Sequence, residues 1–175
     1  MMPTTSLKIR IYNDPCLRKK SSPVDSVGIA EKWLIQEMVK AMNEYKGVGL
    51  AAPQVGINKR ILIADIGNGP VAIINPQILK KSVKTSVQEE GCLSIPGVTV
   101  KIKRPKRIFV KYLDENNQRV EKYFDDLMAR VVLHETDHLN GKLIIDYVGL
   151  LKRKKVLEQL KALQVPKKEQ HAAHP

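Results

Sequence analysis

Two histidines that stand four residues apart, with a glutamate between them, are the residues best suited to chemistry in this sequence. They belong to the stretch His134-Glu135-Thr136-Asp137-His138. In a helix, positions i and i+4 lie on one face, so both imidazoles can bind the same metal ion. Glu135 can then take a proton from metal-bound water, as in the HExxH pattern of zinc hydrolases. The pattern is short, and a polar helix face with two surface histidines is the alternative interpretation.

A catalytic metal site usually has three protein ligands, so the two histidines require a third partner elsewhere in the chain. Cys92 is the best candidate, because a thiolate is a strong ligand and the preceding Gly91 permits close approach. A small buried hydrophobic residue is the alternative for Cys92. We expect that simpler role for Cys16, which has no histidine or acid cluster around it.

Hydrophobic spacing predicts the helices that must position these residues. The histidines belong to a helix that Asp125 or Asp126 can cap and that stops at Asn140-Gly141. An amphipathic helix is expected over residues 29–45 and another over residues 147–164. The apolar face expected for this last helix consists of Leu150, Val156, Leu157, Leu160 and Leu163.

Alternating apolar residues and turn signals predict two β-hairpins. The first joins residues 60–66 to residues 71–74 across a Gly-Asn-Gly-Pro turn. The second joins residues 107–113 to residues 119–124. Further strand signals cover residues 77–87 and 98–103.

The stretch GVGLAAPQVG, residues 47–56, combines small residues with a single polar amide, that of Gln54. Small residues let another backbone approach closely, so we expect a loop and edge strand against which a ligand can lie. A tight packing turn is the alternative interpretation.

Length and composition indicate one globular domain. The chain has 175 residues, of which 43% are hydrophobic and 27% charged, as in a soluble protein with its own core. We expect a single domain over residues 1–165 and a polar, disordered tail over residues 166–175. No apolar run approaches the roughly 20 residues that span a bilayer. The N-terminus lacks a signal-peptide core and two cysteines fit a reducing compartment, so we expect a cytoplasmic location.

The charge balance indicates an anionic partner such as nucleic acid. Lys and Arg number 30 against 18 Asp and Glu, which gives a net charge of +12. Much of the excess lies in the last predicted helix, at Lys152-Arg153-Lys154-Lys155. Simple solubility is the alternative explanation.

Three stretches of the chain, taken together, resemble the motifs of the peptide deformylases. They are residues 47–56 (GVGLAAPQVG), residues 90–94 (EGCLS) and residues 134–141 (HETDHLNG), in the order of that family. The resemblance implies a metallohydrolase that removes the formyl group from the N-terminal formyl-methionine of nascent proteins and releases formate. We therefore expect an α+β fold in which antiparallel β-sheets wrap around a central helix that carries HExxH. An N-terminal amphipathic helix and a C-terminal basic helix would complete this fold.

The resemblance also implies a role for each motif residue. Cys92, His134 and His138 would hold one divalent metal, Fe2+ in the family's physiological form, although Zn2+, Ni2+ or Co2+ could occupy the purified protein. Metal-bound water would attack the formyl carbon, and Glu135 would take its proton and deliver it to the departing amine.

The remaining site residues follow from the same resemblance. The side-chain amide of Gln54 and the backbone N–H of Leu93 would stabilise the oxyanion. The peptide would lie as an added strand near Gly49 and Gly91, and an apolar pocket would read its methionine. The candidate pocket residues are Val48, Leu50, Leu93 and Val131.

One residue departs from the family pattern, which has glutamine immediately before the first metal-binding histidine. Leu133 occupies that position here, and the loss of a hydrogen bond at this point could weaken metal binding. Arg104 matches an arginine of the family, and we expect it to pair with Glu90 or Asp137 beneath the site.

By resemblance, we expect the basic segment 152–155 to bind the ribosome, whereas a solvated helix face is the alternative. Neither membrane binding nor direct DNA binding is expected. The rival enzyme class is a zincin-type metallopeptidase, but the sequence offers no convincing third ligand downstream of His138. A non-catalytic RNA-binding protein would explain the charge and leave the three motifs unused.

Overall fold

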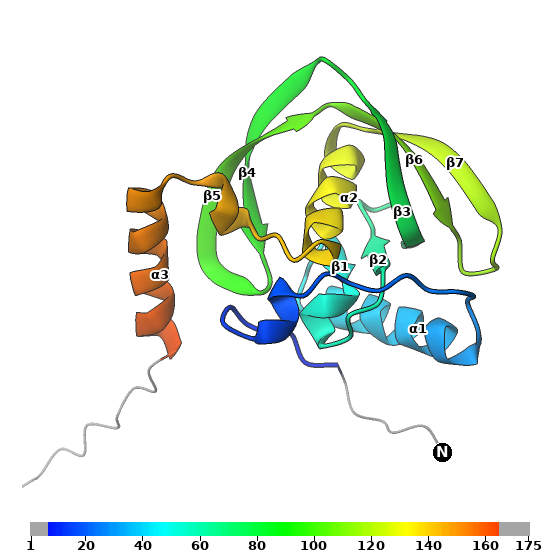
Figure 1. The fold of residues 1–175 in the computed structure, drawn as a ribbon, viewed down its shortest axis with the longest axis horizontal. Helices are drawn as coiled ribbons and strands as arrows, with labels where there is room; N and C mark the ends of the chain where they lie inside the picture. Colours follow the sequence, from blue (N-terminus) through cyan, green and yellow to red (C-terminus); the bar gives the residue numbers. More distant parts are fainter. Residues whose placement is uncertain (1–6, 165–175) are drawn as a thin grey trace, which may run out of the picture.

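The computed structural model describes residues 7–164 and shows a mixed α/β architecture with antiparallel sheets and three α-helices (Figure 1). The mixed class and the antiparallel sheets were expected from the sequence. In chain order, the elements are η1 (Pro15–Arg18), α1 (Ile29–Glu44), β1 (Gly49–Ala51), η2 (Ala52–Val55), β2 (Ile61–Ala64), β3 (Val71–Lys81), β4 (Thr85–Cys92), β5 (Ile95–Pro105), β6 (Arg107–Leu113), β7 (Arg119–Asp125), α2 (Asp126–Leu139), η3 (Ile144–Tyr147) and α3 (Leu150–Gln164), the η elements being short 3-10 turns.

The strands form a five-stranded sheet, in the order β1-β2-β3-β6-β7, and a two-stranded sheet of β4 and β5. Both predicted hairpins are confirmed, because β2 pairs with β3 and β6 pairs with β7 in antiparallel register. The mixed stretch 77–87 proves to hold the end of β3 and the start of β4. β3 is therefore much longer than the run of residues 71–74 that alternation indicated.

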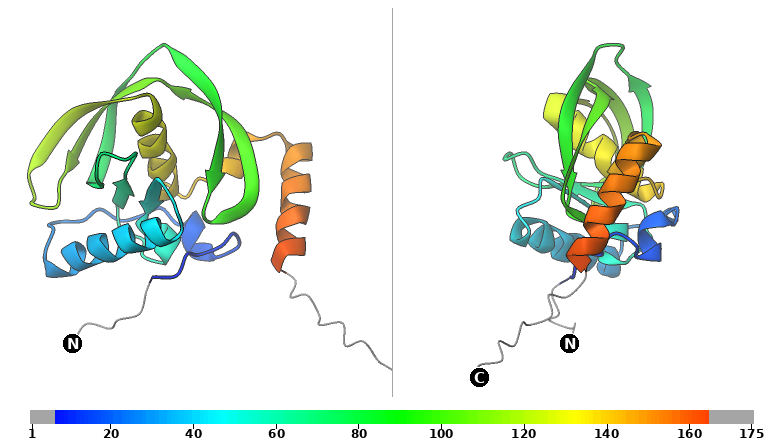
Figure 2. Two further views of the ribbon diagram at one scale, coloured as in Figure 1. Left: turned by 180° about the vertical axis from the view of Figure 1, so that it is seen from behind. Right: turned by 90° about the vertical axis from the view of Figure 1, so that its left-hand side faces the viewer.

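Helix α2 lies between the two sheets and contacts strands of both (Figures 1 and 2). One face of α2 is apolar and packs with β1, β2 and β6 in a buried cluster that includes Ala129, Val132 and Leu133. The polar residues of α2 that contact β4, Arg130 and His134, alternate with these apolar residues along the helix and lie on another face. The hydrophobic effect thus fixes the rotation of α2 about its own axis, and with it the direction of its histidines.

The ends of α2 show one confirmed prediction and one that was wrong. The helix ends at Leu139 with Asn140 as its C-cap, and Gly141 follows with φ of 72°, where a Cβ atom would also lie only 2.5 Å from the carbonyl oxygen of Arg18. Asp125 holds the N-cap position, but its side chain makes no capping hydrogen bond. Its carboxylate pairs instead with Arg107 across the β6-β7 ladder.

The terminal helices agree with the expected positions to within a few residues. α1 begins at Ile29 as predicted and packs on β1 and β2. α3 begins at Leu150 instead of residue 147, because η3 occupies the residues before it, and it packs against β5 and η3 (Figure 2). Val156 and Leu160 are buried as expected, whereas Leu150 is 85% exposed and does not belong to the apolar face.

Three further expectations concern the periphery. Cys16 is half-buried and its Sγ lies 3.1 Å from Asn58 Oδ1, so the expected hydrophobic role was wrong. The expected tail, residues 166–175, lies outside the described residues. Within residues 7–164, no helix is long and apolar enough to cross a membrane.

Candidate functional site

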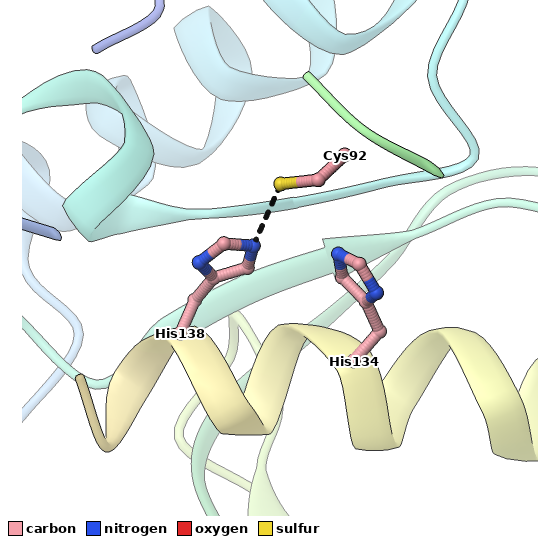
Figure 3. Close-up of side chains that lie close together, drawn as sticks. All are labelled: Cys92, His134 and His138. Atoms are coloured by element: carbon pink, nitrogen blue, oxygen red, sulfur yellow. Dashed lines mark hydrogen bonds between the residues drawn. The ribbon is translucent and has the colours of Figure 1, made fainter. Parts of the chain in front are cut away.

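Cys92 and the two histidines come together although they belong to different elements. Cys92 ends β4, and His134 and His138 face it from α2 (Figure 3). Their ligand atoms lie within 4.8 Å of one another, and Cys92 Sγ is 3.2 Å from His138 Nε2. Ligand atoms that share one tetrahedral metal at about 2.0–2.3 Å are about 3.3–3.6 Å apart. The donor set and its spacing therefore fit a single divalent cation.

The β4-β5 ladder decides where Cys92 points. Residues two apart on a strand share a face, so Glu90 and Cys92 both project from β4 towards α2. The pairing is regular up to Gly91 and then shifts, so that Cys92 pairs with Ile95. Such irregularities bend a strand and re-aim its side chains.

Glu90 is the partner of the first histidine. Its Oε2 lies 3.0 Å from His134 Nδ1, which leaves Nε2 of that ring to face a metal. Burial disfavours the charged carboxylate, but hydrogen bonds from Arg104 and His134 outweigh burial and lower the pKa of Glu90 to about 2. An ionised carboxylate behind a ligating histidine fixes its tautomer and strengthens it as a ligand.

The two histidines differ in their electrostatics. Burial lowers the pKa of His138 well below its usual value, which favours the neutral imidazole that binds metals. Burial also acts to lower the pKa of His134, but contacts with Cys92 and Glu90 outweigh it and raise that pKa well above the usual value.

Arg104 connects the acids beneath the site, as the sequence analysis expected. Its Nε and Nη2 each donate to the carboxylate of Glu90 at 2.8 Å, and its Nη1 donates to Asp137 at 2.8 Å. Tyr147 also donates to Asp137, at 2.7 Å. The prediction named Glu90 or Asp137 as the partner, and the structure confirms both.

Arg130 is a residue that the sequence analysis missed. Its Nη1 lies 2.6 Å from Glu90 Oε1, so two buried arginines hold one carboxylate. Arg130 precedes His134 by four residues, a spacing that places two side chains on the same helix face. That spacing was the available signal, but nothing in the local sequence shows that Glu90 lies opposite.

Leu133 takes no part in these contacts. Its side chain is buried in the apolar cluster that packs against β1 and β2. The hydrogen-bond partner of His134 comes from β4 instead, so the imidazole ring is oriented without a polar residue at position 133.

Glu135 lies beside the ligands with its carboxylate buried. Its Oε2 has no hydrogen-bond partner among the described residues, and burial raises its pKa to about 7. A Cβ atom at Gly49 would lie 2.5 Å from Glu135 Oε1, so β1 leaves room for this carboxylate only because it carries glycine there. A carboxylate with a pKa near neutrality can both accept and return a proton.

Gln54 presents its amide N–H to the same centre. Its Oε1 accepts a hydrogen bond from Ala51 N at 2.8 Å, which orients the amide so that Nε2 donates to Ser94 Oγ at 3.3 Å. Nε2 also lies 3.7 Å from Cys92 Sγ. Leu93 follows Cys92 directly and lines the same cleft.

The cleft beside these residues has a volume of about 980 Å³. Of the predicted substrate-binding residues, Val48, Gly49, Gly91 and Val131 line it. Leu50 does not: it points to the other side of β1 and is fully buried in the cluster that α1 covers. We therefore leave Leu50 out of the candidate pocket.

Comparisons with known proteins agree with the motifs. The family model of polypeptide deformylase matches residues 6–154. A peptide deformylase of Thermotoga maritima is 50% identical over 155 residues, which are 86% of this chain and 94% of that protein. One from Clostridium botulinum is 49% identical over 138 residues, 79% of this chain and 93% of its own.

Solved structures show the same likeness. The crystal structure of peptide deformylase from Thermotoga maritima has a TM-score of 0.81 at 50% identity and covers 83% of this chain and 99% of its own. That of Ehrlichia chaffeensis peptide deformylase in complex with actinonin has a TM-score of 0.88 at 36% identity and covers 92% and 99%.

Proposed function

The chain belongs to the polypeptide deformylase family, and from this premise we propose how its own residues perform the reaction. Enzymes of this family hydrolyse the formyl group from the N-terminal formyl-methionine of proteins, and the protein is such an enzyme. The observation that carries the residue assignment is the convergence of Cys92, His134 and His138, beside a cleft that Cys92, His134 and the buried Glu135 line.

We propose that Cys92, His134 and His138 hold the divalent metal. When bound, such an ion activates water for attack and polarises the formyl carbonyl. We propose Fe2+ as the physiological metal, by the family resemblance. The same thiolate and imidazole donors also suit Zn2+, Ni2+ and Co2+, so the ion found after purification depends on availability and handling.

Glu135 carries the proton in this proposal. Its carboxylate accepts a proton from the attacking water and passes it to the peptide nitrogen as the carbon–nitrogen bond breaks, which yields formate and a free amine. The burial of this side chain and its pKa of about 7 support the assignment, because the same group must act first as base and then as acid.

Gln54 and Leu93 are proposed to stabilise the negative charge that develops on the formyl oxygen. The amide of Gln54 is already held by Ala51, so its N–H donor needs little reorganisation during the reaction. The loss of one such donor typically costs about 100- to 1,000-fold in rate.

We propose that the peptide binds as an extended strand beside Gly49 and Gly91. β1 is an edge strand of the five-stranded sheet, which leaves backbone groups for an added strand. Val48, Leu93 and Val131 would contact the methionine side chain, because all of them line the cleft.

Formate release from a formyl-methionyl peptide tests these assignments. We expect activity in the wild type, a loss of about 1,000-fold or more in Glu135→Gln, and metal loss in Cys92→Ser. Normal turnover by Glu135→Gln would contradict the proton assignment. Cleavage of internal bonds in a blocked, unformylated peptide would point to a zincin-type peptidase instead.

We also propose a cytoplasmic location and salt-sensitive ribosome binding through residues 152–155 of α3. Lys154 and Lys155 are exposed, whereas Arg153 lies 3.3 Å from Asp146 and is partly compensated. Cosedimentation with ribosomes at increasing salt checks this, since each phosphate contact steepens the salt dependence. Full binding after all four residues are neutralised would contradict it.

A further inference from the structure

Arg130 bonds α2 to both strands of the β4-β5 sheet. Besides its contact of 2.6 Å with Glu90 Oε1, its Nη1 donates to the carbonyl oxygen of Ile102 on β5 at 3.1 Å. Its Nη2 donates to the carbonyl oxygen and the hydroxyl of Ser86 on β4 at 2.9 and 3.0 Å. The guanidinium is planar and its donors are fixed in direction, so this set of contacts tolerates little movement.

The proposed metal ligands lie on the two elements that this arginine joins. Cys92 shares a face of β4 with Glu90, and His134 shares a face of α2 with Arg130. Each ligand therefore has a neighbour on its own element, and these two neighbours are bonded to one another. The Glu90–Arg130 contact thus joins the strand to the helix beside the proposed metal centre, next to the direct contact of Glu90 with His134.

Arg104 holds the same carboxylate in a different way. It approaches Glu90 from β5, the partner strand of β4, and it reaches α2 at Asp137, beside His138. Among the described residues, Arg130 is the arginine of α2 that donates a hydrogen bond to Glu90, one helical turn before His134. Glu90 Oε1 accepts from Arg130 and from Arg104, and the other oxygen, Oε2, accepts from Arg104 and faces His134 Nδ1.

We propose that Arg130 is a positioning residue of the metal centre, which acts through Glu90 to fix the spacing between Cys92 and His134. This inference rests on the proposed metal site and adds to it a residue outside its ligands. Arg130 also lines the cleft, so the rival roles are a wall of the methionine pocket or a purely structural contact.

Co2+ is a suitable probe because its visible spectrum reports thiolate ligation and ligand geometry independently of turnover. Its affinity would be measured by competition with a chelator in Arg130→Met, Arg130→Lys and the control Arg107→Met. Contacts of this kind typically change metal affinity by about 10- to 100-fold, which is the loss expected for Arg130→Met. Arg130→Lys retains a donor for Glu90 and should recover most of the loss, and Arg107→Met should equal the wild type.

A double-mutant cycle tests whether Arg130 acts through Glu90. In a Glu90→Gln background, Arg130→Met should weaken Co2+ binding much less than it does alone, because the group it positions has changed. Where Arg130→Met fails to fold, the same cycle with Arg130→Gln serves, because glutamine also removes the charged contact with Glu90. Independent, additive losses in the cycle would overturn the proposal.

Other outcomes would overturn it as well. Wild-type Co2+ affinity and spectrum in Arg130→Met, even with a lower unfolding temperature, would make Arg130 purely structural. An increased KM for a formyl-methionyl peptide with unchanged Co2+ affinity would assign Arg130 to the methionine pocket. Failure of the wild type to bind Co2+, or equal binding by Cys92→Ser, would instead refute the metal site itself.

Discussion

Arginine–carboxylate pairs occur in this protein in two contrasting settings. Beneath the proposed metal site, Arg104 and Glu90 are each 5% exposed and belong to a continuous network that includes Arg130. On the β6-β7 ladder, Arg107 and Asp125 pair with 59% and 49% of their side chains exposed. Water screens the second pair well and the first pair very little, so an ion pair should control stability beneath the site and matter little on the ladder.

Removal of Arg104 should have the largest effect on the free energy of unfolding, because its ion pairs are the buried ones. Arg104→Ala leaves the buried carboxylate of Glu90 and the partly buried carboxylate of Asp137 undercompensated, and the loss of one partner of a buried ion pair typically costs about 3–5 kcal/mol of the free energy of unfolding. Urea denaturation followed by circular dichroism measures the loss, and metal content of the purified variant should fall with it. Unchanged stability and metal content would show that Arg130 alone suffices for Glu90.

Substitution of Gly49 tests whether the carboxylate of Glu135 is held as rigidly as the charges beneath it. In Gly49→Ala, the new methyl group would lie 2.5 Å from Glu135 Oε1 and 2.7 Å from Val131 Cγ1, so the carboxylate must move. A displacement of a catalytic group by about 1 Å can cost about 100-fold in rate, which is the loss of kcat expected for Gly49→Ala.

Steady-state assays of formate release check the Gly49→Ala prediction. The matched control is Gly149→Ala, because no heavy atom lies within 4 Å of a Cβ placed there. Wild-type kcat in Gly49→Ala would mean that Glu135 can shift without consequence for the reaction.

The carboxylate of Asp146 is intermediate in exposure between the two pairs, with 19% of its side chain exposed. Its contribution to stability should depend on pH. Partial burial acts to raise its pKa, but the hydrogen bonds from Arg18 and from the backbone N–H of Leu143 outweigh burial and lower it. A carboxylate whose pKa is lower in the folded state stabilises the protein above its unfolded pKa of about 3.9, and the gain disappears as pH falls through the folded pKa.

Asp146→Asn should therefore be less stable than the wild type at neutral pH, and the difference should shrink below about pH 4. Thermal unfolding of both proteins across this range measures the difference. A difference that stays constant with pH would mean that the Asp146 charge contributes nothing to the stability.

The smallest effect is expected at the exposed pair. Arg107→Ala should leave the free energy of unfolding, the metal content and the turnover unchanged within error, because solvent already stabilises both charges. Thermal unfolding and the formate assay provide the check. A loss comparable with that of Arg104→Ala would remove the distinction between the two settings.

Local patterns explain why much of the fold could be predicted. The two hairpins follow from turn residues between alternating runs. The start of α1 at Ile29 follows from the helical spacing of its apolar residues, and the end of α2 follows from the stop signal Asn140-Gly141. The N-cap at Asp125 failed because Arg107, a neighbour across the ladder, competes for its carboxylate. Such competition depends on pairing between strands and is invisible in the local sequence.

The candidate site divides in the same way. The spacing of His134 and His138 by itself determined that both could face one ion, because helix geometry is a local property. The register shift at Cys92, the side of β1 that Leu50 occupies, and the meeting of Arg130 with Glu90 were decided only by the tertiary structure. Each depends on which strand lies opposite which helix face, and burial of the apolar side of α2 is what fixes that arrangement.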